Sequence, residues 1–348
     1  MHKLNLTSRF FQLAVLGLVL AAGALGWLPD TALALPVALL AVAPFPVQPE
    51  LTAIAIAYRN ARLIADEVAP RVGVGTQSFK YLKHTMADSF TIPDTKVGRK
   101  SRPNQVDFSA AETESSTQDY ALDDAVPQAD IDNAPPNYDP LGRATEGLTD
   151  LIMLDREKRV ADLVFDAAQY ATANKVVLSG TSQWSDFTNS DPVANLMAGL
   201  DACIMRPTAM VIGRAAFTKL ATHPKIAKAV LGNAGDVTIA TRQQLAALFE
   251  LDDVLVGEGW VNTAKKGQAA SLARVWGKHC ALIYRNRLAD TRRGMTFALT
   301  AQFGGRISGA EYDRNIGMRG GQMVRVGESV KELITANDLG YFIQNAVA

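Results

Sequence analysis

The stretch PTAMVIGRAAFTKLATHPKIAKAV at 207–230, followed by LAALFELDDVLVGEGWVNTA at 245–264, decides the fold of this 348-residue chain. The apolar run at 208–212 has the length and composition of a short buried strand. Helical spacing follows and is interrupted by the step His223-Pro224, where the proline suits the start of a second helix. A third helix then leads into an apolar strand at 253–257. Strands that alternate with helices in this way predict a compact α/β module.

A long helix is predicted before this module, from Pro140 to about Asn174. Asp139 can accept hydrogen bonds from the free amides at its start, and proline suits its first position. One apolar stripe holds Val160, Leu163, Val164, Ala167 and Ala171, and the residues off that stripe are Arg156, Lys158, Arg159 and Asp162. An unbroken helix of this length would span about 50 Å at 1.5 Å per residue, which is typical of a strut.

The segment 76–135 divides its charges between two halves. Six basic residues stand against two acids between positions 80 and 102, whereas eight acids and no Lys or Arg lie between 103 and 132. The segment has few large apolar side chains, so it cannot bury a core of its own. Two interpretations remain open, a disordered linker or an arm that rests on another surface. The length of the segment favours a functional projection.

The first 49 residues have a different composition. Residues 10–29 carry no charge and follow Lys3 and Arg9. About 20 apolar residues suffice to cross a bilayer, and a signal peptide has a similar pattern. Four interpretations stay open: a membrane-active segment, a targeting signal, a propeptide and a non-native extension.

The sequence offers no set of residues for catalysis, a cofactor or a metal ion. The 35 basic and 35 acidic side chains cancel, which argues against general binding to nucleic acids or membrane surfaces. Cys203 and Cys280 lack the spacing of metal ligands. His279 adjoins Cys280, but neighbours in a strand point to opposite faces, so they do not form a nucleophile pair. His223 precedes a proline and is expected to cap or end a helix. We therefore expect a protein that is not an enzyme.

The order of these segments carries a resemblance to a known family. The two stretches quoted first resemble the axial domain of major capsid proteins of tailed bacteriophages with the HK97-like fold. The closing GMRGGQMVRVGESVKELITANDLGYFIQNAV at 317–347 is similar to the last peripheral-domain strands of that family. The long helix stands where their spine helix would be, and the charged segment stands where their extended loop would be. The resemblance covers about residues 50–348, and the apolar first 49 residues depart from it.

The resemblance implies an α+β capsid fold with six parts. These are an apolar N-terminal segment (1–49), an N-arm (50–75), an extended β-hairpin loop (76–135), a peripheral domain with the spine helix (136–192), an axial domain (193–294) and a return to the peripheral domain (295–348). It also implies self-assembly into pentamers and hexamers of an icosahedral head that encloses double-stranded DNA without sequence specificity. Implied partners are a portal, a scaffold or protease and decoration proteins. The implied location is the virion, after assembly in the cytoplasm of a bacterial host.

In such a shell the extended loop would lie across a neighbouring subunit. A segment that has basic and acidic halves but no core of its own becomes ordered by docking on a partner. The composition of 76–135 therefore agrees with a loop that lies across a neighbouring subunit. The residues expected to form contacts between subunits are Lys80, Lys83, Lys96, Arg99, Lys100, Arg102, Asp119, Asp123 and Asp124. Some family members crosslink a loop lysine to an asparagine of another subunit, for which Lys80, Lys83, Lys96 and Lys100 are available. Two other functions remain as alternatives, an encapsulin-like nanocompartment shell and a membrane-anchored or exported α/β protein.

Overall fold

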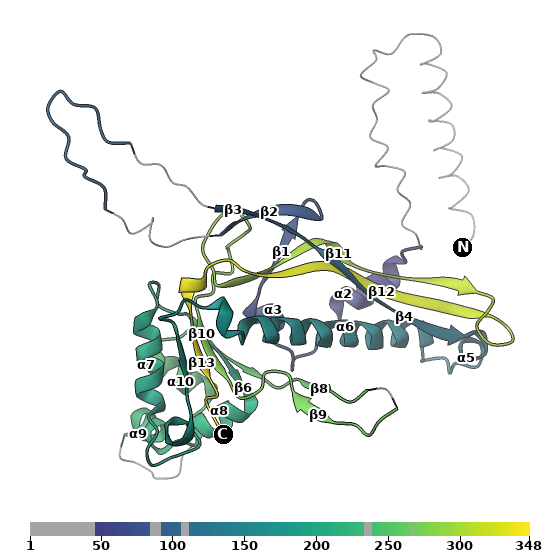
Figure 1. Ribbon diagram of the computed structural model, residues 1–348. Coiled ribbons are helices and arrows are strands. Elements are labelled where there is room, and N and C mark those ends of the chain that lie inside the picture. Colours follow the sequence, from purple (N-terminus) through teal and green to yellow (C-terminus); the bar gives the residue numbers. More distant parts are fainter. Residues whose placement is uncertain (1–45, 84–91, 106–110, 233–238, 266) are drawn as a thin grey trace, which may run out of the picture. The chain divides into compact units, whose positions relative to one another are not determined.

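The computed structural model describes residues 46–83, 92–105, 111–232, 239–265 and 267–348 (Figure 1). The chain divides into two units, 1–46 and 47–348, and the fold described below is that of the second. The apolar stretch at 10–29 lies outside the described residues. Within the described ranges, no helix is both long enough and apolar enough to span a bilayer.

A five-stranded sheet forms the module predicted from the opening stretch. Its order is β5 (Lys175–Val177), β13 (Gly340–Gln344), β10 (Cys280–Ile283), β6 (Ala209–Gly213) and β7 (Asp253–Gly257). Strand β6 lies between β10 and β7 and is buried on both faces, which explains its continuous apolar run. Met210 and Ile212 pack with the helices of the module, whereas Ala209 and Val211 face a second core with the end of helix α6.

Four helices accompany the sheet, and their starts follow the capping signals in the sequence. They are α7 (Pro192–Ala202), α8 (Arg214–Ala221), α9 (Pro224–Leu231) and α10 (Arg242–Phe249). Asp191 caps α7 by accepting from the amide of Ala194, and Thr241 forms a capping box with Gln244 at α10. His223 caps α9 by accepting from the amide of Lys225, which confirms its predicted role.

A four-stranded sheet has the order β1 (Arg71–Val74), β11 (Ala298–Asp313), β12 (Gly321–Ile334) and β4 (Gln118–Pro127). Helices α2 (Pro49–Ala57) and α6 (Pro140–Val164) lie along this sheet (Figure 1). The core between them contains Leu51, Leu148, Ile152, Val324 and Val326. Helix α2 ends at Ala57, and a short helix α3 covers Ala65–Val68 further along the chain.

The long helix is shorter than the sequence predicted. It ends at Val164, so its 25 residues span about 38 Å at 1.5 Å per residue. Asp166 then caps the 3-10 turn η3 (Ala167–Gln169). Phe165 and Tyr170 both stack on Phe342 in the neighbouring strand β13. The apolar residues beyond 164 therefore pack as a turn against the sheet and do not continue the helical stripe.

The segment 76–135 contains elements of two kinds. Strands β2 (Ser78–Lys83) and β3 (Ala111–Ser116) form a two-stranded antiparallel hairpin. Strand β4 and the short helix α5 (Gln128–Asp132) belong to the body, because β4 pairs along its whole length with β12. Much of the acidic half is therefore a strand of the four-stranded sheet, while the basic half lies in the hairpin.

The C-terminal strands also differ from the expected arrangement. Residues 340–344 were expected with the peripheral strands, but β13 pairs with β10 in the five-stranded sheet. Strand β11, which pairs with β1 and β12, was not predicted at all. Smaller elements complete the described chain: the hairpin of β8 (Trp260–Asn262) and β9 (Leu272–Arg274), and the 3-10 turns η4 (Gly180–Ser182) and η5 (Asn337–Leu339).

Candidate functional site

The β2–β3 hairpin is attached firmly to the body at its root. Tyr81 is buried among Leu299, Ala301 and Leu333 of the four-stranded sheet. The amide of Leu82 donates to the carbonyl of Thr291 at 3.0 Å. The direction in which the hairpin leaves the sheet is therefore set by packing on β11 and β12.

Lys80, the first of the predicted basic contact residues, forms ion pairs within the hairpin. The ammonium group of Lys80 lies 3.2 Å from Glu112 and 3.9 Å from Glu114, both on the paired strand β3. These side chains are more than half exposed, so the pairs contribute little to stability. Lys83, at the end of β2, is exposed.

The outer part of the hairpin, residues 92–105, is exposed throughout. It is folded locally, because the Asp94 side chain accepts from the amide of Lys96 and the Asn104 side chain donates to the carbonyl of Asp94. A turn from Gly98 to Ser101 closes it. Four predicted contact residues lie here and form no ion pair with any residue that the structure describes: Lys96, Arg99, Lys100 and Arg102. We call residues 92–105 the basic tip.

The predicted acidic residues lie in β4, away from the hairpin. Asp123 has a partner in its own chain, since Arg325 of β12 donates two hydrogen bonds of 2.7 and 2.6 Å to its carboxylate. The hydrogen bond from Arg325 holds the pKa of Asp123 below its usual value. Asp119 and Asp124 are exposed and have no ion pair among the described residues. The structure thus separates the basic and acidic candidates and leaves members of both sets available on the surface.

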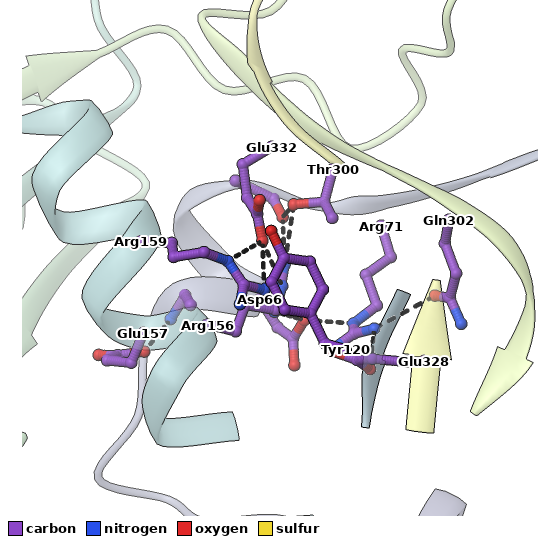
Figure 2. A network of polar contacts seen from close by, with 12 residues as sticks. Asp66, Arg71, Tyr120, Arg156, Glu157, Arg159, Thr300, Gln302, Glu328 and Glu332 are labelled. Carbon is purple, nitrogen blue, oxygen red and sulfur yellow. Dashed lines mark hydrogen bonds and ion pairs between the residues drawn. The ribbon is translucent and has the colours of Figure 1, made fainter. Parts of the chain in front are cut away.

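A network of polar side chains connects α6 with strands of the four-stranded sheet (Figure 2). Arg156 of α6 is almost fully buried, forms an ion pair with Asp66 and donates to Thr300 at 2.9 Å. The sequence places Arg156 off the apolar stripe of the helix. Its side chain is nevertheless buried, because α6 is covered on one side by the four-stranded sheet and on another by the five-stranded sheet.

The same network includes two further arginines and a shared carboxylate. Glu328, fully buried in β12, lies 2.8 Å from Arg71 and 3.0 Å from Arg306. Burial raises the pKa of Glu328, but the guanidinium groups of Arg71 and Arg306 outweigh burial and leave it lowered. Arg159 pairs with Glu332 and stacks over the ring of Tyr120 in β4, 3.6 Å from its centroid. These contacts join α6 to the four strands β1, β11, β12 and β4.

Sequence reasoning did not identify these network residues. A charged residue in an amphipathic helix is normally solvated, and the partners of Arg156 and Glu328 are distant in the chain. The network has a structural role, because its carboxylates and arginines pair with one another. Among the described residues, no group of three or more His, Cys, Asp and Glu could hold a metal ion.

Comparison with known proteins assigns the family. Residues 161–271 match the family model described as phage major capsid protein E. The major capsid protein of Pseudomonas phage JBD67 is 59% identical over 306 residues, which cover 88% of this chain and 99% of that protein. The chain belongs to the phage major capsid proteins. This capsid protein is also similar to the major capsid protein of Burkholderia phage BcepMu, with 31% identity over 246 residues, 68% of this chain and 76% of that one.

Solved structures show the same fold for the capsid protein. A phage-related protein from Bordetella bronchiseptica RB50 has a TM-score of 0.68 and 24% identity, and the match covers 86% of this chain and 97% of that one. The capsid of cyanophage P-SCSP1u has a TM-score of 0.53 and 10% identity, with 83% and 89% covered. The α+β, HK97-like fold expected from the segment order is confirmed. The capsid protein self-assembles into a shell and is located in the virion.

Proposed function

We propose that this capsid protein assembles as pentamers and hexamers into an icosahedral head that encloses double-stranded DNA, with the β2–β3 hairpin of each copy contacting a neighbouring copy. The observation that carries the proposal is the basic tip. It holds four exposed basic residues that have no ion pair among the described residues. The two relatives that are phage major capsid proteins favour this function over the nanocompartment alternative.

The proposal includes the division into N-arm, extended loop, peripheral domain and axial domain. It also includes assembly in the host cytoplasm, DNA bound without sequence specificity, and a portal, a scaffold or protease and decoration proteins as partners. The capsid protein would act in all of these as a structural component without a catalytic residue.

Electrostatics alone gives each contact of the hairpin a modest strength. An exposed ion pair contributes about 0.2–1 kcal/mol. Every copy in a shell repeats the same contacts, so small contributions add up over the assembly. The basic tip has no core of its own and gains order when a partner covers it.

Reversing the charge of the basic tip tests the proposal. The variant Lys96→Glu, Arg99→Glu, Lys100→Glu and Arg102→Glu should fold normally and form few or no shells, as measured by sedimentation and negative-stain microscopy. The matched control reverses four exposed lysines of the axial domain and has the same net charge: Lys219→Glu, Lys228→Glu, Lys265→Glu and Lys278→Glu. Normal shells from the tip variant, or equal loss in both variants, would contradict the role of the hairpin.

A further inference from the structure

Residues 178–190 lie between β5 and α7 and contain only the short turn η4 as regular structure. We call them the cover segment. Trp184 in its middle is fully buried in the core of the five-stranded module, and Leu178 at its start is buried there as well. A segment with so little regular structure depends on its contacts with other elements to stay in place.

The C-terminal residues hold the cover segment on one side. The amide of Trp184 donates to the carbonyl of Ala346 at 2.8 Å, and the side chain of Gln183 donates to the carbonyl of Asn345 at 3.1 Å. Asn345 lies in the left-handed region at φ 54°, a conformation that a residue other than glycine keeps when its surroundings fix it. His279 helps to fix it, because the amide of Asn345 donates to Nδ1 of His279 at 3.0 Å. His279 therefore acts on the cover segment through residues 345–346.

His223 holds the other end of the cover segment. Its side chain is fully buried, and Nε2 lies 3.0 Å from Oγ of Ser190. The ring of Phe187 packs edge-on against it, with 5.4 Å between the centroids, and Lys219 of α8 lies over the Phe187 ring. Nδ1 of His223 accepts from the amide of Lys225 at 3.2 Å, which is the hydrogen bond that caps α9. Since Nδ1 is an acceptor, the ring proton lies on Nε2 and is donated to Ser190.

Both histidines use Nδ1 to accept a main-chain N–H, and only the neutral ring can do so. A second proton would occupy Nδ1 and remove both hydrogen bonds. In His223 it would also place a positive charge at the start of α9, where the helix dipole disfavours cations. We infer that His223 and His279 form a pH-sensitive switch, which holds the cover segment in place at neutral pH and releases it when the two rings are protonated.

The charged groups around His223 come from three parts of the module. They are Asp186 of the cover segment, Asp191 at the start of α7 and Lys225 of α9. Burial lowers the pKa of His223 and Lys225 lowers it further, whereas Asp191 and Asp186 raise it. Hydrogen bonds to both aspartates lower their own pKa values, so their charge stays constant near neutral pH. The titration of this site near neutral pH therefore belongs to the imidazole.

The surroundings of His279 are mainly aromatic. The rings of Phe165 and Phe342 lie 5.4 and 5.7 Å from it between centroids, and its neighbours in the chain are the exposed Lys278 and the buried Cys280. Burial lowers the pKa of His279 below its ordinary value of 6.5. A histidine with a lowered pKa contributes stability that is present above pH 6.5 and is lost as pH falls through the pKa of the folded state. Both histidines therefore favour release of the cover segment in mild acid.

Hydrogen exchange of the full-length, unassembled chain tests the switch, with rates corrected for the intrinsic effect of pH. Between about pH 7.5 and about pH 5.5, exchange in 178–190 and 345–348 should accelerate by up to about tenfold for each histidine that is released, because the released imidazole has its ordinary pKa. Residues 140–164 of α6 are the internal control and should not accelerate. Equal acceleration in α6 would indicate unfolding of the whole subunit. That result, or unchanged exchange in the cover segment, would overturn the inference.

Asparagine variants assign the effect to the two rings. In His223→Asn and His279→Asn, a side-chain oxygen replaces Nδ1 as the acceptor and does not titrate, and asparagine is a favourable residue at a helix start. The double variant should keep slow exchange in the cover segment at both pH values, whereas His223→Ala should exchange rapidly at both. Acceleration in acid that persists in the double variant would overturn the inference. If the double variant does not fold, each single variant should lose about a tenfold share of the pH effect, and a full wild-type effect in both would overturn the inference.

Discussion

The carboxylate of Glu157 accepts a hydrogen bond of 2.5 Å from the indole Nε1 of Trp276, although the two residues are 119 positions apart. Both side chains are fully buried. The same carboxylate accepts from the amides of Ile64 and Ala65 at 3.0 and 2.7 Å. One side chain of α6 therefore holds the start of α3 and the segment before β10 together.

Removing this carboxylate should destabilise the subunit. Glu157→Ala leaves three buried donors without an acceptor, which should cost about 2–5 kcal/mol of unfolding free energy. Glu157→Gln keeps one acceptor oxygen and should cost less than half as much. Urea unfolding of the unassembled chain measures both. Asp162→Ala, at an exposed position of the same helix, is the control, and an equal loss in that variant would contradict the role of Glu157.

The stability difference between the wild type and Glu157→Gln should depend on pH. Burial raises the pKa of Glu157 above its ordinary value of 4.5. The protonated carboxyl group is therefore bound more tightly in the folded state than in the unfolded state. The stability that this proton contributes is fully present below pH 4.5 and is lost as pH rises through the pKa of the folded state. The wild type should therefore lose stability relative to the glutamine variant with increasing pH. A wild type that gains stability relative to this variant as pH rises would contradict the assignment.

Glu328 should have the opposite pH dependence and a larger effect. Its carboxylate is shared by Arg71 and Arg306. Glu328→Gln leaves Arg306 without its charge partner and leaves Arg71 paired with Asp66 alone, at a cost of about 3–5 kcal/mol. Its pKa is lowered, so this stability is present above 4.5 and lost as pH falls through the folded pKa. Unfolding curves of the two proteins should converge in acid, whereas the exposed control Glu311→Gln should follow the wild type at every pH.

Gly257 should not tolerate a side chain. A Cβ at this position would lie 2.1 Å from the ring of Trp276, which is itself fully buried. Gly257→Ala should therefore lower the unfolding free energy by about 1–3 kcal/mol, as overpacking does. Gly73→Ala is a matched control, because nothing lies within 4 Å of the added carbon. Equal melting temperatures for the two variants would show that the Trp276 side chain can move away from the added carbon at little cost in free energy, and would contradict the prediction.

The two cysteines should be unreactive in the folded subunit. Burial raises the pKa of Cys203 to about 12 and raises that of Cys280 further. Since the thiolate is the reactive form, labelling at neutral pH should be slow for both thiols and slowest for Cys280. Mass spectrometry after a maleimide pulse measures this, with the unfolded chain as the reference in which both thiols are labelled. Rapid labelling of folded shells would contradict the described burial.

Shell formation should weaken as salt is added. Charges at the surface of the basic tip are screened beyond about 10 Å at 0.1 M salt. The yield of wild-type shells should fall between low and high salt, and the charge-reversed tip variant should show a smaller dependence. Light scattering during assembly follows both. Wild-type assembly that is independent of salt would point to apolar contacts as the main contribution of the hairpin.

Short-range patterns predicted much of the secondary structure. The caps at Asp139 and His223 marked helix starts correctly, because a cap depends on residues close in the chain. The strand at 253–257 was predicted with its observed bounds. The spine helix was predicted too long, because the stacking of Phe165 and Tyr170 on Phe342 ends it and involves a strand far away in the sequence.

By itself the sequence determined the order of the elements, the family resemblance and the charge contrast between the two halves of 76–135, since each depends on composition and local spacing. Only the tertiary structure decided that the acidic half forms an edge strand beside α6 and that Asp123 is already paired with Arg325. It also decided that Arg156 and Glu157 are buried in the spine helix. Which side chains are buried, and which groups they pair with, depends on contacts between segments that are far apart in the sequence. The periodicity of a helix indicates only which of its faces is apolar.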